Sequence, residues 1–172
     1  VAVHQHGYGV VTMADIARLA GASAASINYY FGSKEGLMEA TMRHLLRKLR
    51  AAMITGYSAA NSPTERLYAV MNANFSDQLF TVEQCSIWMQ FWASAPYSPH
   101  LARLHHLNRA RVRSHFRAEL RHLLPDDRVE TARQALQNYM DGAWLQAALS
   151  DQPLDPSSAR RAARRVVDLA LS

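Results

Sequence analysis

Cysteine is almost absent from this sequence, and lysine and long uncharged stretches are scarce. Cys85 is the only cysteine, so no disulfide can form within the chain, which fits a reducing cytosol. Of the 19 basic residues, only Lys34 and Lys48 are lysine. The longest run without charge, residues 84–102, contains glutamines, prolines and a histidine, and it is too polar and too broken to span a bilayer. No signal peptide is visible. These absences exclude a disulfide-stapled secreted domain and a helical membrane protein, so we expect a soluble cytoplasmic protein.

The residues that are present have the composition of a globular helical protein. The 172 residues are 49% hydrophobic and 19% charged, which is enough for a buried core. The formal charge of +5 and the pI near 9.7 favour a polyanionic partner without identifying one. No window shows the sustained alternation of apolar and polar residues that is typical of strands. The sequence therefore predicts an all-α fold.

Helix-start signals divide the chain. The sequence SPTE at residues 62–65 is a capping-box pattern with proline at the first helical position, and an Asp-Pro pair occurs at 155–156. Asp126 or Asp127 provides a third cap. We expect helices near residues 13–20, 24–31, 33–54, 63–80, 82–94, 99–124, 127–149 and 156–171, after the end of a helix at 1–6.

Residues 12–31, TMADIARLAGASAASINYYF, have the spacing of a helix-turn-helix. Ala17 is small enough to let two helices cross closely, Gly21 ends the first helix in the left-handed region, and Ile27 is the apolar contact of the second. Small residues at the start of the second helix let its backbone enter the DNA major groove, which is about 12 Å wide. The alternative is an ordinary helical hairpin with exposed alanines and an exposed asparagine.

The stretch continues, and TMADIARLAGASAASINYYFGSKEGLMEA resembles the DNA-binding signature of the TetR/AcrR family of bacterial transcriptional regulators. The resemblance implies a helix-turn-helix DNA-binding domain over residues 1–46, with its first helix mostly missing. It also implies a larger helical ligand-binding and dimerisation domain over residues 47–172. The DNA contacts that it implies come from Thr12, Ala24, Ala25, Ser26, Asn28, Tyr29, Tyr30 and Lys34.

These side chains suit two parts of DNA recognition. Thr12 and Lys34 stand at helix N-termini, where phosphates of the DNA backbone bind. Asn28 can pair bidentately with adenine, and Tyr29 and Tyr30 can reach phosphates or thymine methyl groups. Asn28 occupies a position where the family usually has tyrosine, so the operator sequence cannot be taken from relatives.

Aromatic residues recur in the second half of the chain. Trp88 and Trp92 are one helical turn apart. Neighbouring expected helices carry Phe75, Tyr97, Tyr139 and Trp144. Two or three aromatic faces with a carboxylate, here Asp141 or Asp77, form a cage for a quaternary ammonium group, because a cation is attracted to ring faces. The alternative is that the tryptophan pair packs in the core or at a dimer contact.

The segments SIWMQFWASA and YMDGAWLQAALS resemble, more loosely, the BetI-type branch of the same family. The best-known members of that branch respond to choline. The resemblance therefore implies a small-molecule effector, choline or another organic cation.

The last two expected helices carry apolar stripes. One stripe runs through Val129, Ala132, Leu136, Tyr139, Met140 and Ala143, and the other through Val166, Leu169 and Ala170. Two such helices from each subunit form a four-helix bundle about a two-fold axis, and the resemblance to the family implies such a homodimer. The alternative is burial of both stripes within one chain.

Other patterns do not change this interpretation. A basic stripe, which we interpret as a solvated face, runs through Arg109, Arg113, Arg117 and Arg121. No two histidines have the i, i+4 spacing of a metal site, and no phosphate-binding loop or nucleophile motif occurs. We therefore expect no metal, no cofactor and no enzymatic activity. The sequence predicts a dimeric, ligand-responsive repressor on a pseudo-palindromic double-stranded DNA operator. The alternative is a helical small-molecule-binding protein without a DNA-binding role.

Overall fold

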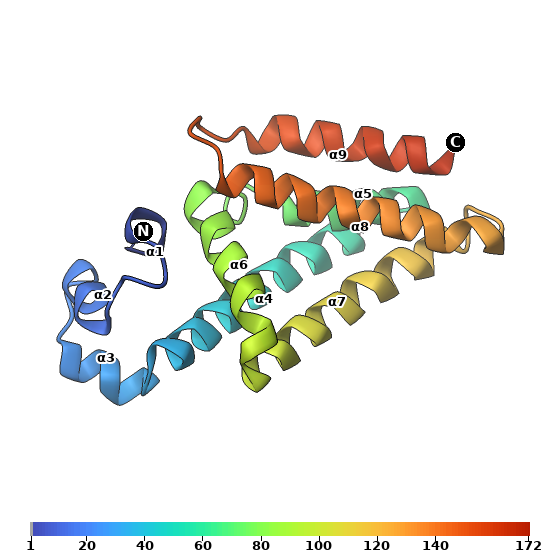
Figure 1. The fold of residues 1–172 in the computed structure, drawn as a ribbon. Helices are drawn as coiled ribbons and strands as arrows, with labels where there is room; N and C mark the ends of the chain where they lie inside the picture. Colours follow the sequence, from blue (N-terminus) through green and yellow to red (C-terminus); the bar gives the residue numbers. More distant parts are fainter. Residues whose placement is uncertain (1) are drawn as a thin grey trace.

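Regular structure in residues 2–172, the part of the chain that the computed structural model describes, is helical throughout, and the predicted all-α fold class is confirmed (Figure 1). Three short helices lie together at one end: α1 (Ala2–His6), α2 (Met13–Leu19) and α3 (Ala24–Phe31). The other elements are α4 (Lys34–Ala59), α5 (Pro63–Asn74), α6 (Val82–Ser94), the 3₁₀ turn η1 (Ala95–Tyr97), α7 (Pro99–Leu120), α8 (Asp126–Ala148) and α9 (Pro156–Leu171).

Capping side chains start several helices where the sequence predicts them. Oxygens of Ser23, Ser62 and Asp155 accept backbone N–H groups in the first turns of α3, α5 and α9. The α5 cap is completed by Glu65, whose carboxylate accepts the N–H of Asn61 at 2.6 Å. These helix starts follow from local sequence alone.

Some helix boundaries differ from the predictions. Pro125 occupies the N-cap position of α8, and the two aspartates after it lie in the first turn without making a side-chain cap. Their charge still favours the N-terminus of the helix dipole. The helix predicted over 63–80 ends at Asn74, because the next segment turns to bury both Phe75 and Phe80. Their rings meet edge-to-face with 5.0 Å between centroids.

The longest helix, α4, connects the three N-terminal helices to the rest of the molecule (Figure 1). It has 26 residues and runs past its predicted end at residue 54. Its buried face carries Met38, Met42, Leu45, Leu49 and Met53. The predicted domain boundary at residues 46 and 47 falls inside this unbroken helix, so no linker marks it. Neither α4 nor any other helix in residues 2–172 has the length and apolar character that a membrane crossing needs.

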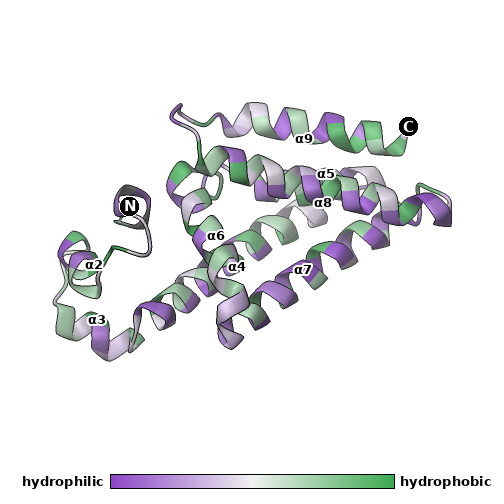
Figure 2. Ribbon diagram, viewed as in Figure 1, coloured by the Kyte–Doolittle hydropathy of each residue, from purple (hydrophilic) through white to green (hydrophobic). Residues whose placement is uncertain are grey.

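The helices α8 and α9 lie side by side along one edge of the molecule (Figure 1), and hydrophobic residues recur along both (Figure 2). The interpretation of the predicted α8 stripe as a dimer surface needs correction, because Leu136 and Met140 are buried in the core of the single chain. Apolar residues on other faces remain uncovered. Leu145 of α8 is 47% exposed, and Leu169 of α9 is 72% exposed.

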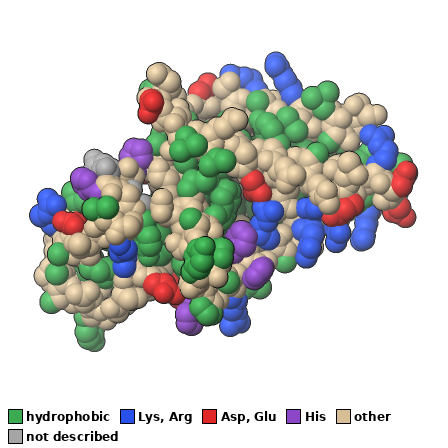
Figure 3. All heavy atoms as spheres, viewed as in Figure 1, with side chains coloured by type: hydrophobic (Ala, Val, Ile, Leu, Met, Phe, Trp, Pro, Cys, Tyr) green, Lys and Arg blue, Asp and Glu red, His purple; other side chains and the backbone are tan. Residues whose placement is uncertain are grey.

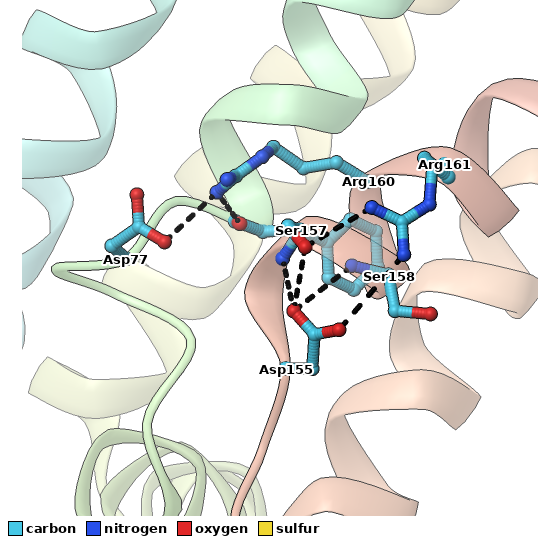
Figure 4. A network of polar contacts seen from close by, with 7 residues as sticks. Asp77, Asp155, Ser157, Ser158, Arg160 and Arg161 are labelled. Atoms are coloured by element: carbon cyan, nitrogen blue, oxygen red, sulfur yellow. Dashed lines mark hydrogen bonds and ion pairs between the residues drawn. The ribbon is translucent and has the colours of Figure 1, made fainter.

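A polar network fixes the start of α9 to the segment between α5 and α6 (Figure 4). Arg160 donates to the carbonyl oxygen of Phe75 at 2.9 Å and pairs with Asp77 at 3.3 Å. Asp155 accepts the N–H groups of Ser157 and Ser158 at the other side of the network. The Asp77 side chain is 78% exposed. It therefore belongs to this surface network and not to an aromatic cage.

Candidate DNA-binding surface and effector cavity

The outer face of α3 is uncovered. None of its residues is buried, and Tyr29 is 84% exposed. The Tyr30 ring meets that of Tyr29 edge-to-face with 5.3 Å between centroids. The other predicted DNA-contacting residues of α3 are exposed as well: Ala24, Ala25, Ser26 and Asn28. The structure therefore leaves every predicted recognition-helix residue accessible to a partner.

Close contacts hold α3 in place from its inner side. Ile27 and Phe31 are half-buried, and α3 contacts α2 and α4. Gly21 and Gly32 follow α2 and α3 with φ of 65° and 69°, in the left-handed region. Gly36 lies in the first turn of α4, where a Cβ would be 2.1 Å from the Phe31 carbonyl oxygen. Sequence reasoning missed Gly36, although a glycine inside a helix is an unfavourable choice that signals close packing.

Thr12 starts α2 with a reciprocal cap. Its hydroxyl accepts the N–H of Asp15 at 3.1 Å, and the Asp15 carboxylate accepts the N–H of Thr12 at 3.1 Å. The Thr12 hydroxyl also donates to this carboxylate at 2.6 Å. These bonds lower the pKa of the Asp15 carboxyl to about 2. Thr12 is exposed, but its side chain is already engaged in starting the helix.

The ammonium group of Lys34 points back to the loop between α1 and α2. It donates to the carbonyl oxygens of Tyr8, Gly9 and Val11, at 3.3 Å for Gly9 and 2.9 Å for Val11. The same Nζ lies 4.6 Å from the centroid of the Tyr8 ring. The sequence predicts a phosphate contact for Lys34. In the structure its charge holds the loop that leads into Thr12, so it positions the start of α2.

A small cavity lies where α6, α7 and α8 meet. Its volume is about 30 Å³. That is room for a water molecule, whereas small-molecule sites have about 300–1,000 Å³. Trp88 and Trp144 meet edge-to-face with 5.5 Å between centroids, and Trp92 lies 6.0 Å from Trp88. These three tryptophans and Asp141, all predicted effector residues, come together in the lining.

Arg109 of α7 also lines this cavity, and it forms an ion pair with Asp141 of α8. Burial raises the pKa of the Asp141 carboxyl, while the hydrogen bond from Arg109 opposes that shift. A second arginine of the predicted solvated stripe also forms an ion pair, because Arg117 pairs with Glu130 of α8 at 2.6 Å while its side chain stays 40% exposed. Their acidic partners lie on α8, so the regular spacing of the arginines along α7 does not predict these pairs.

The cavity has unpaired hydrogen-bond donors beside its aromatic walls. The indole N–H groups of Trp88 and Trp144 are buried without a partner among the described residues. An unpaired buried donor costs about 1–3 kcal/mol. The described lining therefore combines ring faces with a carboxylate and a guanidinium.

The remaining predicted cage residues lie outside the cavity. Phe75 is fully buried, and its ring centroid is 6.3 Å from that of Tyr139. Phe80, which the sequence did not single out, stacks edge-to-face on Trp144 with 5.9 Å between centroids. Tyr97 does not join the cluster. It is 89% exposed, because η1 carries it away from the core at the end of α6.

Two family profiles match successive parts of the chain. The profile "Bacterial regulatory proteins, tetR family" matches residues 2–41, which include α1, α2 and α3. The profile "BetI-type transcriptional repressor, C-terminal" matches residues 63–172, from α5 to α9. The chain belongs to the TetR family. Its C-terminal domain is of the BetI type.

Curated relatives extend the similarity over the whole chain. An HTH-type transcriptional regulator BetI from Burkholderia thailandensis is 38% identical over 171 residues, covering 99% of this chain and 88% of the relative. A protein of the same name from Ectopseudomonas mendocina is 40% identical over 173 residues, with the same coverage. The resemblance noted in the sequence is confirmed.

Solved structures share the fold. A transcriptional regulator from Rhodococcus sp. RHA1 has a TM-score of 0.81 at 21% identity, covering 99% of this chain and 90% of that one. A regulator from Saccharomonospora viridis, solved in complex with choline, has a TM-score of 0.79 at 20% identity, covering 96% and 89%.

Membership in the TetR family establishes the general role of this chain. It is a DNA-binding transcriptional regulator of a repressor type and not an enzyme. Members of the family respond to small molecules and usually act as dimers. Within residues 2–172, no three side chains are placed to hold a metal ion together.

Proposed function

We propose that this TetR-family repressor recognises its operator through the open face of α3. The observation that carries the proposal is the exposure of residues 24–26 and 28–30 on a helix that Ile27 and Phe31 hold from behind. The alanines at its start let the backbone approach base edges in a groove about 12 Å wide. Asn28 pairs with an adenine, and the neighbouring tyrosine hydroxyls donate to phosphates.

Binding to the DNA that flanks its gene tests this role. Fluorescence anisotropy should give tighter binding to that DNA than to random DNA of equal length, with affinity falling as salt rises. Asn28→Ala should cost about 1–3 kcal/mol on the operator and relax preference at one base pair. Binding to random DNA should stay unchanged. Equal losses on both DNAs would remove Asn28 from the base-reading role.

We further infer that the effector is an organic cation such as choline and that it binds at the α6–α8 cavity. Trp88, Trp92 and Trp144 offer ring faces, and Asp141 adds a carboxylate to the lining. A protein with the same fold holds choline. Since the cavity has only about 30 Å³, a cation of this size enters only when the surrounding helices move apart.

Arg109 occupies the position that such a cation needs. Its guanidinium pairs with Asp141, so an incoming ammonium group replaces it and breaks a link between α7 and α8. The half-buried carboxylate keeps a cationic partner throughout, which avoids the cost of leaving it alone. When the effector replaces Arg109, the ion pair between α7 and α8 is lost and α7 can move relative to α8.

A contact at the start of α7 leads toward the DNA-binding helices. The Ser98 hydroxyl accepts the N–H of Leu101 at 3.2 Å, which caps α7, and it donates to the Glu35 carboxylate in the first turn of α4. The next residue, Gly36, packs against the end of α3. A shift of α7 thus moves α4 and α3. An effector that prefers the shifted arrangement therefore lowers operator affinity, and the operator lowers effector affinity by the same factor.

Calorimetry with choline and its neutral isostere 3,3-dimethylbutanol tests the cation. Choline should bind more tightly by about 1–3 kcal/mol, because shape is matched and only the charge differs. Trp92→Ala should remove much of that difference, and Trp92→Phe should keep part of it. Arg109→Gln should tighten choline binding, because nothing then competes for Asp141. Equal affinity of the two compounds for the unmodified protein would show that the site is merely apolar.

We also propose that two copies pair through uncovered faces of α8 and α9. These faces expose Leu145, Leu149 and Leu169, and α8 adds the small residues Ala135 and Gly142, which allow close approach of another helix. Pairing about a two-fold axis lets the two copies of α3 enter successive major grooves of the operator, which lie about 34 Å apart along the DNA. We place the protein in the cytoplasm, where a bacterial regulator meets the chromosome.

A further inference from the structure

A groove of about 450 Å³ runs between α4 and α7, outside the aromatic cavity. Its volume is in the range of small-molecule sites, about 300–1,000 Å³. Leu49, Met53 and Val112 are its buried apolar lining, and Ile54 is exposed at its edge. Val112 also lines the α6–α8 cavity, so it separates the two spaces. The groove offers an apolar surface to a ligand body much larger than that cavity admits.

The rim of this groove is basic. Arg50 of α4 and Arg111 of α7 line it from the two helices, and both also line an adjoining groove of about 230 Å³. No aspartate or glutamate of residues 2–172 lines either groove. Among residues 2–172, neither arginine has an acidic partner, whereas Arg43 in the adjoining groove pairs with Glu39 at 2.6 Å. Arginine side chains, drawn in blue, recur along α7 in Figure 3.

Tyr57 and His115 are further residues of the groove lining. The Tyr57 hydroxyl is buried and makes no hydrogen bond with the described residues. Its ring packs edge-to-face on His115 with 5.3 Å between centroids. Burial raises the pKa of Tyr57 to about 12 and lowers the pKa of His115, so both are neutral at pH 7. Their rings therefore add neutral aromatic surface to the groove lining.

We propose that the α4–α7 groove is a second ligand site, which takes an amphipathic anion with an apolar body and a carboxylate head. The body covers Leu49, Met53 and Ile54, and the carboxylate lies between Arg50 and Arg111. Guanidinium groups bind carboxylates through short, paired hydrogen bonds, and these two have no competing acid. The ligand is opposite in charge to the cation proposed for the aromatic cavity.

The two sites act on α7 from different sides. An anion bound by both Arg50 and Arg111 joins α7 to α4. A cation at Asp141 instead releases α7 from α8. The groove site does not depend on the identity of the cation, because it shares none of the tryptophans or Asp141.

Octanoate is a suitable probe, with octanol as the neutral control and octyltrimethylammonium as the charge-reversed control. Calorimetry on the full chain should show one octanoate per chain, bound at least tenfold more tightly than either control. Arg111→Gln should weaken octanoate about ten- to a hundredfold, because it removes a charged hydrogen-bond donor. Arg113→Gln is the matched control, since Arg113 is exposed on the same helix and does not line the groove. It should change nothing.

Further variants keep the test independent of folding and of the other site. Ile54→Glu places a negative charge at an exposed edge, so octanoate affinity should fall tenfold or more while Tm stays unchanged. Trp92→Ala should leave octanoate affinity as it is. The proposal is overturned if octanol binds as tightly as octanoate, if Arg111→Gln and Arg113→Gln behave alike, or if Trp92→Ala abolishes octanoate binding. Absence of octanoate binding at millimolar concentration overturns it as well.

Discussion

At the scale of the residue, Lys34 has a structural contact in addition to the phosphate contact that the motif predicts. Lys34→Gln should lower the free energy of unfolding by about 1–3 kcal/mol, because carbonyls of the α1–α2 loop lose a charged donor. Lys48→Gln, at an exposed lysine of α4, is the control. Urea denaturation and hydrogen exchange of α2 and α3 measure the effect. If Lys34→Gln leaves stability unchanged but weakens DNA binding, the main role of Lys34 is the predicted phosphate contact and not stabilisation of the loop.

Asp15 gives a residue-scale prediction for pH. Its folded pKa of about 2 lies below the ordinary pKa of 3.8, because the carboxylate accepts hydrogen bonds from the hydroxyl and the N–H of Thr12. The stabilisation is therefore complete above pH 3.8 and is lost as pH falls toward 2. Asp15→Asn should be less stable than the unmodified protein at pH 6, and urea midpoints should converge between pH 4 and 2. A gap that persists at pH 2 would contradict this origin.

At the scale of the element, the contact between Ser98 and Glu35 is the expected link between effector and operator. Glu35→Gln should leave choline affinity and operator affinity nearly unchanged. The factor by which choline weakens operator binding, typically about 5- to 150-fold in allosteric proteins, should fall toward one. Glu39→Gln, one turn further along α4 and paired only with Arg43, is the control. DNA titrations with and without choline decide between them.

Element boundaries show which parts of this fold local sequence determines. The starts of α3, α5 and α9 could be predicted, because each cap and its partner N–H are neighbours in the chain. The end of α5 could not, because Phe75 and Phe80 turn toward rings from distant helices. The residues of the candidate cavity likewise fall into those that local sequence predicts and those that it does not. Spacing brings Trp88 and Trp92 together, whereas nothing local pairs Arg109 with Asp141, 32 positions later.

At the scale of the whole molecule, exposure separates the core from the proposed dimer surface. Leu145→Glu combined with Leu169→Glu should give a folded monomer, because both side chains are exposed in the single chain and the new charges oppose pairing. Leu136→Glu should instead prevent folding, since that side chain is fully buried. Sedimentation and circular dichroism measure mass and helix content. A dimer that survives the double change would place the contact on another face.

The close approach of α4 to α5 holds the C-terminal end of α4, so that a tilt of α4 moves its N-terminal end. A Cβ on Gly56 would lie 2.9 Å from the Cβ of Ala69, so this end of α4 is tightly seated. From Gly56 back to Lys34 the helix extends about 33 Å at 1.5 Å per residue. Tilting a rod of that length by about 5° moves its far end by about 3 Å, which exceeds the tolerance of a hydrogen bond. If α3 reads base edges as proposed, a tilt of this size would withdraw it from them as a rigid body, without unfolding any helix.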